Sequence, residues 1–337
     1  MMLVIEMLRR YGVMSQARLK EYCDLQASTI SYLVNDLKKC GLIKDAEQEQ
    51  REGKVGKPGN LLALNNDMAS FLGLYVEDNW IDTYWIGIDG RILEYKREKY
   101  GENSVESSII DTIQYNMSAH GSIKGIGVAV KGIVQTDGTI KSGKRYGNWD
   151  GKDAWNFEGL ANDLKKQFSE IPFIVENDAN CAAELFHYNT KRIYSNCVTY
   201  LLNQMPFGIG CGLILCGQLY RGGNGSAGEI FEKGGLMRSL AGDRNAGQQN
   251  TETMIQAVMP HILTTGYLLN PNCIVLTGSC FEKITDQELE IIRKMLEDVP
   301  VKVEILSGQD LLNPAQGAAL FAIDRYAADL VGEVTQR

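Results

Sequence analysis

Several features are scarce in this chain of 337 residues, and each absence excludes a class of protein. No apolar run reaches the roughly 18 residues of a membrane-spanning helix, so no contact with a membrane is expected. The eight cysteines are scattered and form no Cys-x-x-Cys pair, which argues against a disulfide framework or a zinc ribbon. The three histidines match no catalytic motif, and the net charge of −8 argues against a protein that coats nucleic acid.

The composition that remains is that of an ordinary globular protein. Apolar residues make up 44% and charged residues 23%, and the length predicts about two domains. The apolar run Met1–Ile5 is short and is followed by Glu6 and Arg9, unlike a signal peptide. With reduced thiols as the simplest state of the cysteines, we expect a cytoplasmic protein.

Charge is distributed unevenly along the chain. Residues 1–66 hold ten Lys or Arg and eight Asp or Glu, a net of +2, so the remainder carries −8 − 2 = −10. A mildly basic head on an acidic body is typical of a small DNA-binding module joined to a ligand-binding domain.

The head has the pattern of a winged helix-turn-helix, assigned to residues 1–67. Apolar periodicity predicts helices near 3–11 and 15–23 and a third near 28–40, which Ser28 or Thr29 would cap. Strands at 42–43 and 61–64 enclose a polar loop that contains Lys54 and Lys57. The residues expected at DNA are Ser28, Thr29, Ser31, Tyr32, Asn35 and Lys38 on the third helix, and Lys54 and Lys57 in the wing. The alternative is a three-helix module for dimerisation or protein contact.

The body repeats one pattern of strands. Strands at 71–76, 83–88 and 91–94 include the hairpin turn Asp89-Gly90, and a similar unit spans 198–220 with Cys216-Gly217 at its turn. Further strands are predicted at 124–130, 173–175, 273–276 and 301–305, with a closing helix at 315–328. The fold class is therefore α/β, and the repeat indicates two related lobes with a cleft between them.

Four segments of the body together resemble the ROK family of repressors, open reading frames and kinases. These segments are residues 125–134 (GIGVAVKGIV), 175–183 (VENDANCAA), 208–212 (GIGCG) and 220–230 (YRGGNGSAGEI). The resemblance implies a two-lobed actin-like ATPase or sugar-kinase fold, which is ribonuclease H-like. Residues 68–337 would form this ROK-type domain, with lobe one about 68–184 plus 315–337 and lobe two about 185–314.

The departures from the family pattern bear on function. Kinases of the family hold ATP phosphates with a hairpin of Asp-x-Gly-x-Thr type, and Tyr75, Glu77 and Asn79 stand at the matching positions. A carboxylate repels phosphate, so we expect no ATP cofactor and no phosphoryl transfer. Phe207 stands where a threonine is expected, and Lys131 replaces a proline.

The zinc site that the resemblance implies is also altered. Glu232 occupies the position of the family's histidine ligand, and residues 233–250 contain no cysteine or histidine. Cys211 and Cys216 lie upstream on a strand pattern and are expected to be buried thiols. We therefore predict no metal.

The expected ligand site follows from the same resemblance. Asp178 matches the family's catalytic base, here vestigial, and Asn177 and Glu229 match its sugar contacts, with Glu232 beside them. The end of a strand followed by a helix lies at the ligand crevice of open α/β folds. The alternative for Asn177 and Asp178 is a purely structural helix N-cap.

These features favour a transcriptional regulator, most simply a repressor of carbohydrate-utilisation genes. Its expected partners are double-stranded operator DNA, a sugar effector and further copies of the chain, as a homodimer or higher homo-oligomer. The alternatives are a sugar kinase that uses ATP and a ligand-independent DNA-binding dimer.

Overall fold

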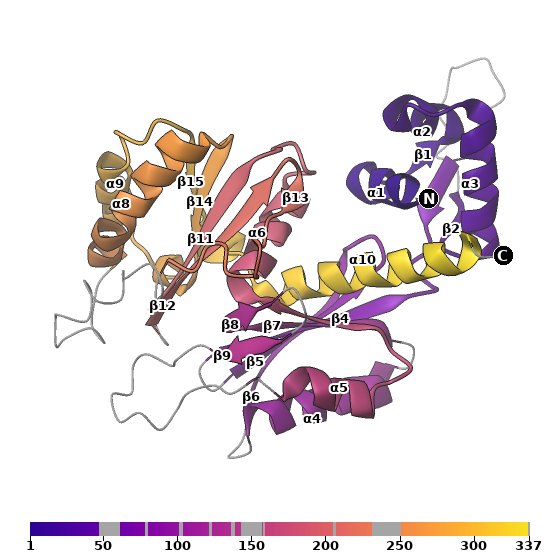
Figure 1. Ribbon diagram of the computed structural model, residues 1–337, viewed down its shortest axis with the longest axis horizontal. Helices are drawn as coiled ribbons and strands as arrows, with labels where there is room; N and C mark the ends of the chain where they lie inside the picture. The colour runs from indigo at the N-terminus through magenta and orange to yellow at the C-terminus, as the bar shows by residue number, and fades with distance from the viewer. Residues whose placement is uncertain are drawn as a thin grey trace.

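The computed structural model describes residues 1–46, 61–77, 80–100, 104–120, 123–135, 139–142, 157, 159–204, 207–230 and 251–335. The first part is a head built from three helices and a small antiparallel sheet with strand order β1-β3-β2 (Figure 1). Its elements are α1 (Met2–Tyr11), β1 (Met14–Ser15), α2 (Gln16–Cys23), α3 (Ala27–Lys39), β2 (Ile43–Ala46) and β3 (Leu61–Leu64).

Local sequence explains most of the head's boundaries. Gly12, with φ of 74°, ends α1, and the Ser15 hydroxyl accepts the Arg18 N–H at 3.3 Å and so caps α2. The prediction that Ser28 or Thr29 caps the third helix is wrong. Helix α3 already begins at Ala27, because Gln26 is the last extended residue before it. Both hydroxyl residues therefore lie in the exposed first turn.

The first sheet of the body has strand order β10-β7-β4-β5-β6. Strands β4, β5 and β6 form an antiparallel meander, and β7 and β10 continue the sheet in parallel. Helices α4 and α5 cover one face, and the long helix α10 lies on the other (Figure 1). The bounds are β4 (Ser70–Glu77), β5 (Trp80–Gly87), β6 (Ile92–Lys99), α4 (Val105–His120), β7 (Ile123–Val130), β8 (Gly132–Val134), β9 (Ile140–Ser142), α5 (Leu160–Gln167), β10 (Phe173–Asn177) and α10 (Pro314–Thr335).

The second sheet repeats this topology with the order β13-β12-β11-β14-β15, an antiparallel meander extended by two parallel strands. The predicted repeat of strands is therefore confirmed. The bounds are α6 (Asp178–Asn189), β11 (Cys197–Gln204), β12 (Phe207–Leu215), β13 (Gln218–Leu219), α8 (Thr251–Leu269), β14 (Cys273–Thr277), η2 (Ser279–Phe281), α9 (Asp286–Met295), β15 (Val303–Ile305) and η3 (Gly308–Asp310).

The glycine-rich segment 208–212 lies inside strand β12. A Cβ on Gly212 would come within 2.4 Å of the Ala179 carbonyl oxygen. These glycines therefore let α6 approach the strand closely. Cys211 is buried as predicted, but Cys216 is exposed, since it forms the β12–β13 turn with φ of 53°.

Helix α10 is the centre of the body and runs from between the lobes to the head (Figure 1). A Cβ on Gly73 or Gly127 would lie 1.9–2.0 Å from α10 carbonyl oxygens, and one on Gly317 would lie 2.0 Å from the Cys181 carbonyl oxygen. Glycine at these points lets α10 sit directly on β4, β7 and α6. The proposed lobe boundary at 184/185 falls within the continuous helix α6. Among the described residues, no helix is long and apolar enough to cross a membrane.

Candidate functional site

The site begins where β10 ends and α6 starts. Asn177 is the N-cap of α6: its Oδ1 accepts the Asn180 N–H at 3.1 Å, and its Nδ2 donates to the Gly132 carbonyl at 3.0 Å. Asn177 therefore caps α6, a role that is compatible with ligand contact. The cap fixes the direction of α6 and aims the next residue, Asp178, at the carboxyl edge of the first sheet.

Asp178 is a buried carboxylate with a defined set of neighbours. Its Oδ1 accepts the Ala179 N–H at 2.9 Å, and its Oδ2 accepts the Tyr75 hydroxyl at 3.3 Å. Burial raises the pKa of Asp178, while nearby Lys131 and the hydrogen bonds act in the opposite direction. The hydrogen bond of 3.3 Å from the Tyr75 hydroxyl is long for an O–H donor. A ligand hydroxyl can therefore replace Tyr75 as the donor to Asp178.

Glu176 of β10, two residues before Asp178, holds the two lobes together at this point. Its Oε1 accepts the Asn177 N–H at 2.8 Å and Asn180 Nδ2 at 2.9 Å. Its Oε2 pairs with Arg221 at 2.7 Å, and Arg221 belongs to the segment after β13. Glu176 and Arg221 lie within the segments 175–183 and 220–230 that resemble the ROK family, but the sequence alone assigns neither residue a role. Their place in these motifs is the one sequence signal that could have identified them.

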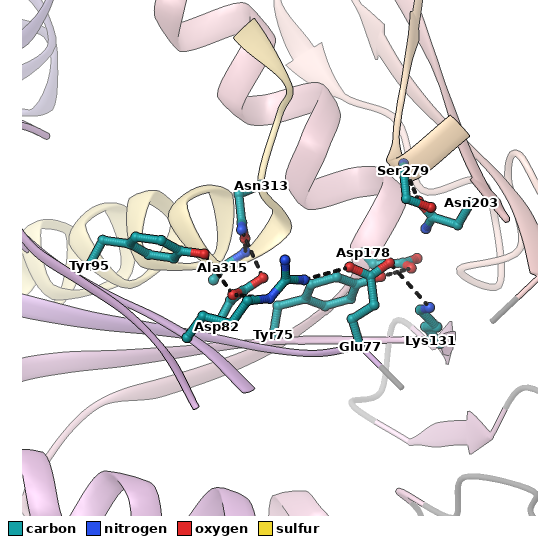
Figure 2. Close-up of polar contacts among 11 residues, drawn as sticks. Tyr75, Glu77, Asp82, Tyr95, Lys131, Asp178, Asn203, Ser279, Asn313 and Ala315 are labelled. Atoms are coloured by element: carbon teal, nitrogen blue, oxygen red, sulfur yellow. Dashed lines mark hydrogen bonds and ion pairs between the residues drawn. The ribbon is translucent and has the colours of Figure 1, made fainter. Parts of the chain in front are cut away.

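A second group of charges lies on strands β4, β5 and β6, together with Lys131 after β7. Glu77 pairs with Arg97 at 3.1 Å. It also lies 3.9 Å from the Lys131 ammonium (Figure 2). Arg97 also pairs at 3.1 Å with Asp82, which is 2% exposed. Burial raises the pKa of Glu77 against the influence of both cations. The charges of β4, β5 and β6 are thus paired with one another and with Lys131.

Asp82 extends this cluster to the start of α10. It accepts the Tyr95 hydroxyl at 2.9 Å and Asn313 Nδ2 at 2.9 Å (Figure 2). Asn313 Oδ1 in turn accepts the Ala315 N–H at 2.9 Å, in the first turn of α10. A cleft of about 250 Å³ opens above the cluster and is closed on the other side by Asn203 and residues 278–279 of lobe two.

The remaining predicted ligand residues are placed less directly. Glu229 follows Gly228, whose backbone packs on the Cys211 carbonyl of β12, and Asp178 lies beside the neighbouring Gly210. Glu232 and Asn79 fall outside the described residues. In the described part of the chain, no cluster of three or more His, Cys, Asp or Glu is arranged for a metal.

The candidate DNA face of the head is presented by α3. Ser28, Thr29, Tyr32 and Asn35 are exposed, and Ser31 is half-buried. Lys38 pairs with Asp45 of β2 at 2.6 Å, so its charge is partly neutralised within the head. Lys54 and Lys57 fall outside the described residues.

The fold and site define a two-lobed protein of sugar-kinase type with an N-terminal helical head. Residues 81–231 match the model of the ROK family. A xylose repressor from Staphylococcus xylosus is 25% identical over 222 residues, which cover 64% of this chain and 55% of that protein. Over these residues the chain is similar to the ROK family. It spans little more than half the length of the first curated relatives it matches.

Two solved structures support the same fold. A ROK family transcriptional regulator, described as a homolog of the E. coli MLC protein, has a TM-score of 0.64 at 15% identity and covers 99% of this chain and 98% of its own. A ROK hexokinase from Thermus thermophilus has a TM-score of 0.54 at 18% identity, over 80% of this chain and 100% of its own. The actin-like sugar-kinase fold of the body is thereby confirmed.

Proposed function

We propose that this protein is a transcriptional repressor that binds operator DNA through its head and a sugar through its body. One observation supports the proposal: Asp178, at the position that the resemblance gives to the sugar-side base, is buried and bonded to Tyr75, while Glu77 of the same hairpin is paired with Arg97. A site that keeps hydroxyl recognition and loses phosphate binding suits a sensor better than an enzyme. The xylose repressor from Staphylococcus xylosus makes D-xylose the first effector to try.

The head, residues 1–67, is proposed to be a winged helix-turn-helix. In support, α2 and α3 are joined by the short link 24–26, and β2 and β3 enclose the position of a wing. Helix α3 would enter the major groove with Ser28, Thr29, Ser31, Tyr32 and Asn35 near bases or phosphates, while Lys38, Lys54 and Lys57 contact the backbone or a minor groove. One such head buries little surface, so a homodimer on an inverted repeat is proposed.

The sugar is proposed to bind between the lobes of the body, residues 68–337. Asp178 would accept a hydroxyl in place of Tyr75, with Asn177, Glu229 and Glu232 around the ring. A hydrogen bond to a charged group contributes about 1.5–3 kcal/mol, so two such bonds suffice for recognition. Several carboxylates in one cleft repel phosphate, which favours an uncharged sugar over a sugar phosphate.

The kinase alternative rests on the retained Asp178 and on the hexokinase of the same fold. It requires ATP phosphates beside Glu77, whose charge repels them. Incubation with radiolabelled ATP and a panel of sugars separates the two functions. A sugar phosphate formed at the expense of ATP would identify a kinase.

The proposed function is tested by two binding measurements on the full chain. Thermal shift against a panel that includes D-xylose, glucose and their phosphates should identify a stabilising neutral sugar. A duplex selected from a random library should then bind, and Lys57→Ala should weaken binding to all duplexes and flatten the salt slope by about one unit. A chain that ignores every duplex at low salt contradicts the repressor function. One that binds DNA but no sugar supports the ligand-independent dimer.

A further inference from the structure

Helix α6 reaches from the candidate sugar site to the head. Its first residue is Asp178, and its last turn is followed by Arg192, which contacts α1 of the head. The helix has 12 residues without interruption, which is about 18 Å of rigid rod. Figure 1 shows it packed between the second sheet and α10. Among the described helices, α6 begins at Asp178, while α10 begins beside the Asp82–Asn313 contact and also reaches the head.

Arg192 ties three elements together at the far end of α6. Its guanidinium pairs with Glu184 of α6 at 2.6 Å. It also lies 3.9 Å from Glu6 of α1 and 4.0 Å from Asp324 of α10. Asp324 in turn pairs at 2.6 Å with Arg9, an α1 residue that is only 9% exposed. The head is therefore held to the body by linked ion pairs, and Arg192 is their centre.

The backbone at Lys191 and Arg192 is held in one conformation between α6 and the head. Lys191 and Arg192 are both left-handed, with φ of 53° and 54°, which non-glycine residues adopt only when their surroundings hold them. The Arg192 N–H donates to the His187 carbonyl at 2.7 Å, and its own carbonyl accepts Arg10 NH2 at 3.4 Å. A displacement of α6 therefore moves the groups that fix the head.

We infer that α6 transmits effector binding to the head by altering the Arg192 joint. This inference rests on the proposed function and names its route of regulation. A sugar hydroxyl that replaces the Tyr75 hydroxyl on Asp178 displaces the start of α6. Because α6 packs directly on Gly210 and Gly212 of β12, the local packing cannot absorb this displacement. Because a close-packed helix moves as a unit, its end shifts relative to Glu6 and Asp324. The two arrangements of the joint then hold the head in different orientations.

The test measures operator affinity of the full chain with and without D-xylose, or the neutral sugar with the largest thermal shift. Glu6→Gln removes a partly exposed head partner of Arg192, and Arg192→Gln removes the centre of the joint. Glu21→Gln on α2 is the matched control, because it neutralises an exposed carboxylate of the same head. We expect the parent and control to change affinity about 5- to 150-fold on sugar binding. Both joint variants should still bind sugar but change affinity about twofold or less.

Joint variants that keep the parent's response overturn the inference. A parent that responds to no sugar contradicts the proposed function instead, and a second measurement then tests the route without ligand or DNA. Asp178→Asn neutralises the start of α6, with Asp163→Asn on α5 as the matched control. Amide hydrogen exchange should change in α1 and residues 184–192 only for Asp178→Asn. A change confined to residues 173–181 refutes transmission along α6.

Discussion

Glu184, buried beside Arg192, allows a quantitative test of the electrostatics of the head joint. Burial raises the pKa of Glu184 to about 7 from its ordinary 4.5, although Arg192 at 2.6 Å lowers it in part. Asp324 also raises this pKa and Arg9 lowers it. In the unfolded chain the carboxyl loses its proton near pH 4.5, so between pH 4.5 and 7 the folded chain holds one proton more. The contribution of Glu184 to the free energy of unfolding therefore falls as the pH rises from about 4.5 to about 7.

The size of the effect follows from the two pKa values. Their difference of about 2.5, at about 1.4 kcal/mol for each pKa unit, corresponds to about 3 kcal/mol. Glu184→Gln mimics the protonated carboxyl at every pH. It should match the parent below about pH 4.5 and exceed its stability by about 3 kcal/mol near pH 8.

Urea unfolding of parent and variant across this range measures the difference directly. Subtracting the parent's free energy of unfolding at each pH cancels the contributions of the other titrating groups. For the control Glu21→Gln, exposed on α2, the difference in free energy of unfolding from the parent should stay constant with pH. If Glu184→Gln is less stable than the parent near pH 8, the ion pair with Arg192 outweighs the cost of burial and the reasoning is refuted.

Three further predictions concern other parts of the molecule. Gly127→Ala on β7 forces a Cβ into the backbone of α10 and should lower the free energy of unfolding by about 3 kcal/mol. Gly332→Ala, in open space on α10, should raise the free energy of unfolding by about 0.5–1 kcal/mol. Equal urea midpoints for the two variants would contradict the packing of α10 on β7. Tyr32→Ala, at a side chain 66% exposed on α3, should weaken duplex binding without changing the melting temperature, while Tyr115→Ala on α4 should change neither. Elemental analysis of the purified chain should find no stoichiometric zinc, and one zinc per chain would overturn the prediction from residues 233–250.

Local patterns in the sequence predicted much of the body. Turn residues such as Asp89-Gly90 and Cys216-Gly217 marked two copies of one meander, and the copies form sheets of the same strand order. The stretch Asn177-Asp178 was correctly placed at a strand end and helix start. These features depend on neighbouring residues, and short-range signals are where sequence reasoning is strongest.

The contacts that complete the site were not predictable in this way. Tyr75 meets Asp178 across 103 positions of sequence, and Asn313 meets Asp82 across 231. Nothing local in the sequence pairs such residues, since α10 and the two lobes must first assemble. The exposed start of α3 was missed for a different reason: Gln26, a poor capping residue, precedes two good ones, and the backbone turned helical first.

The most direct test of a sugar-responsive repressor is the operator affinity of Asp178→Ala with and without D-xylose or the neutral sugar selected by thermal shift. We predict that this variant still binds the operator and that its operator affinity does not change when sugar is added. Asp163→Ala on α5 should respond as the parent does. An Asp178→Ala protein that releases or gains DNA with sugar as the parent does would show that the regulatory site lies elsewhere.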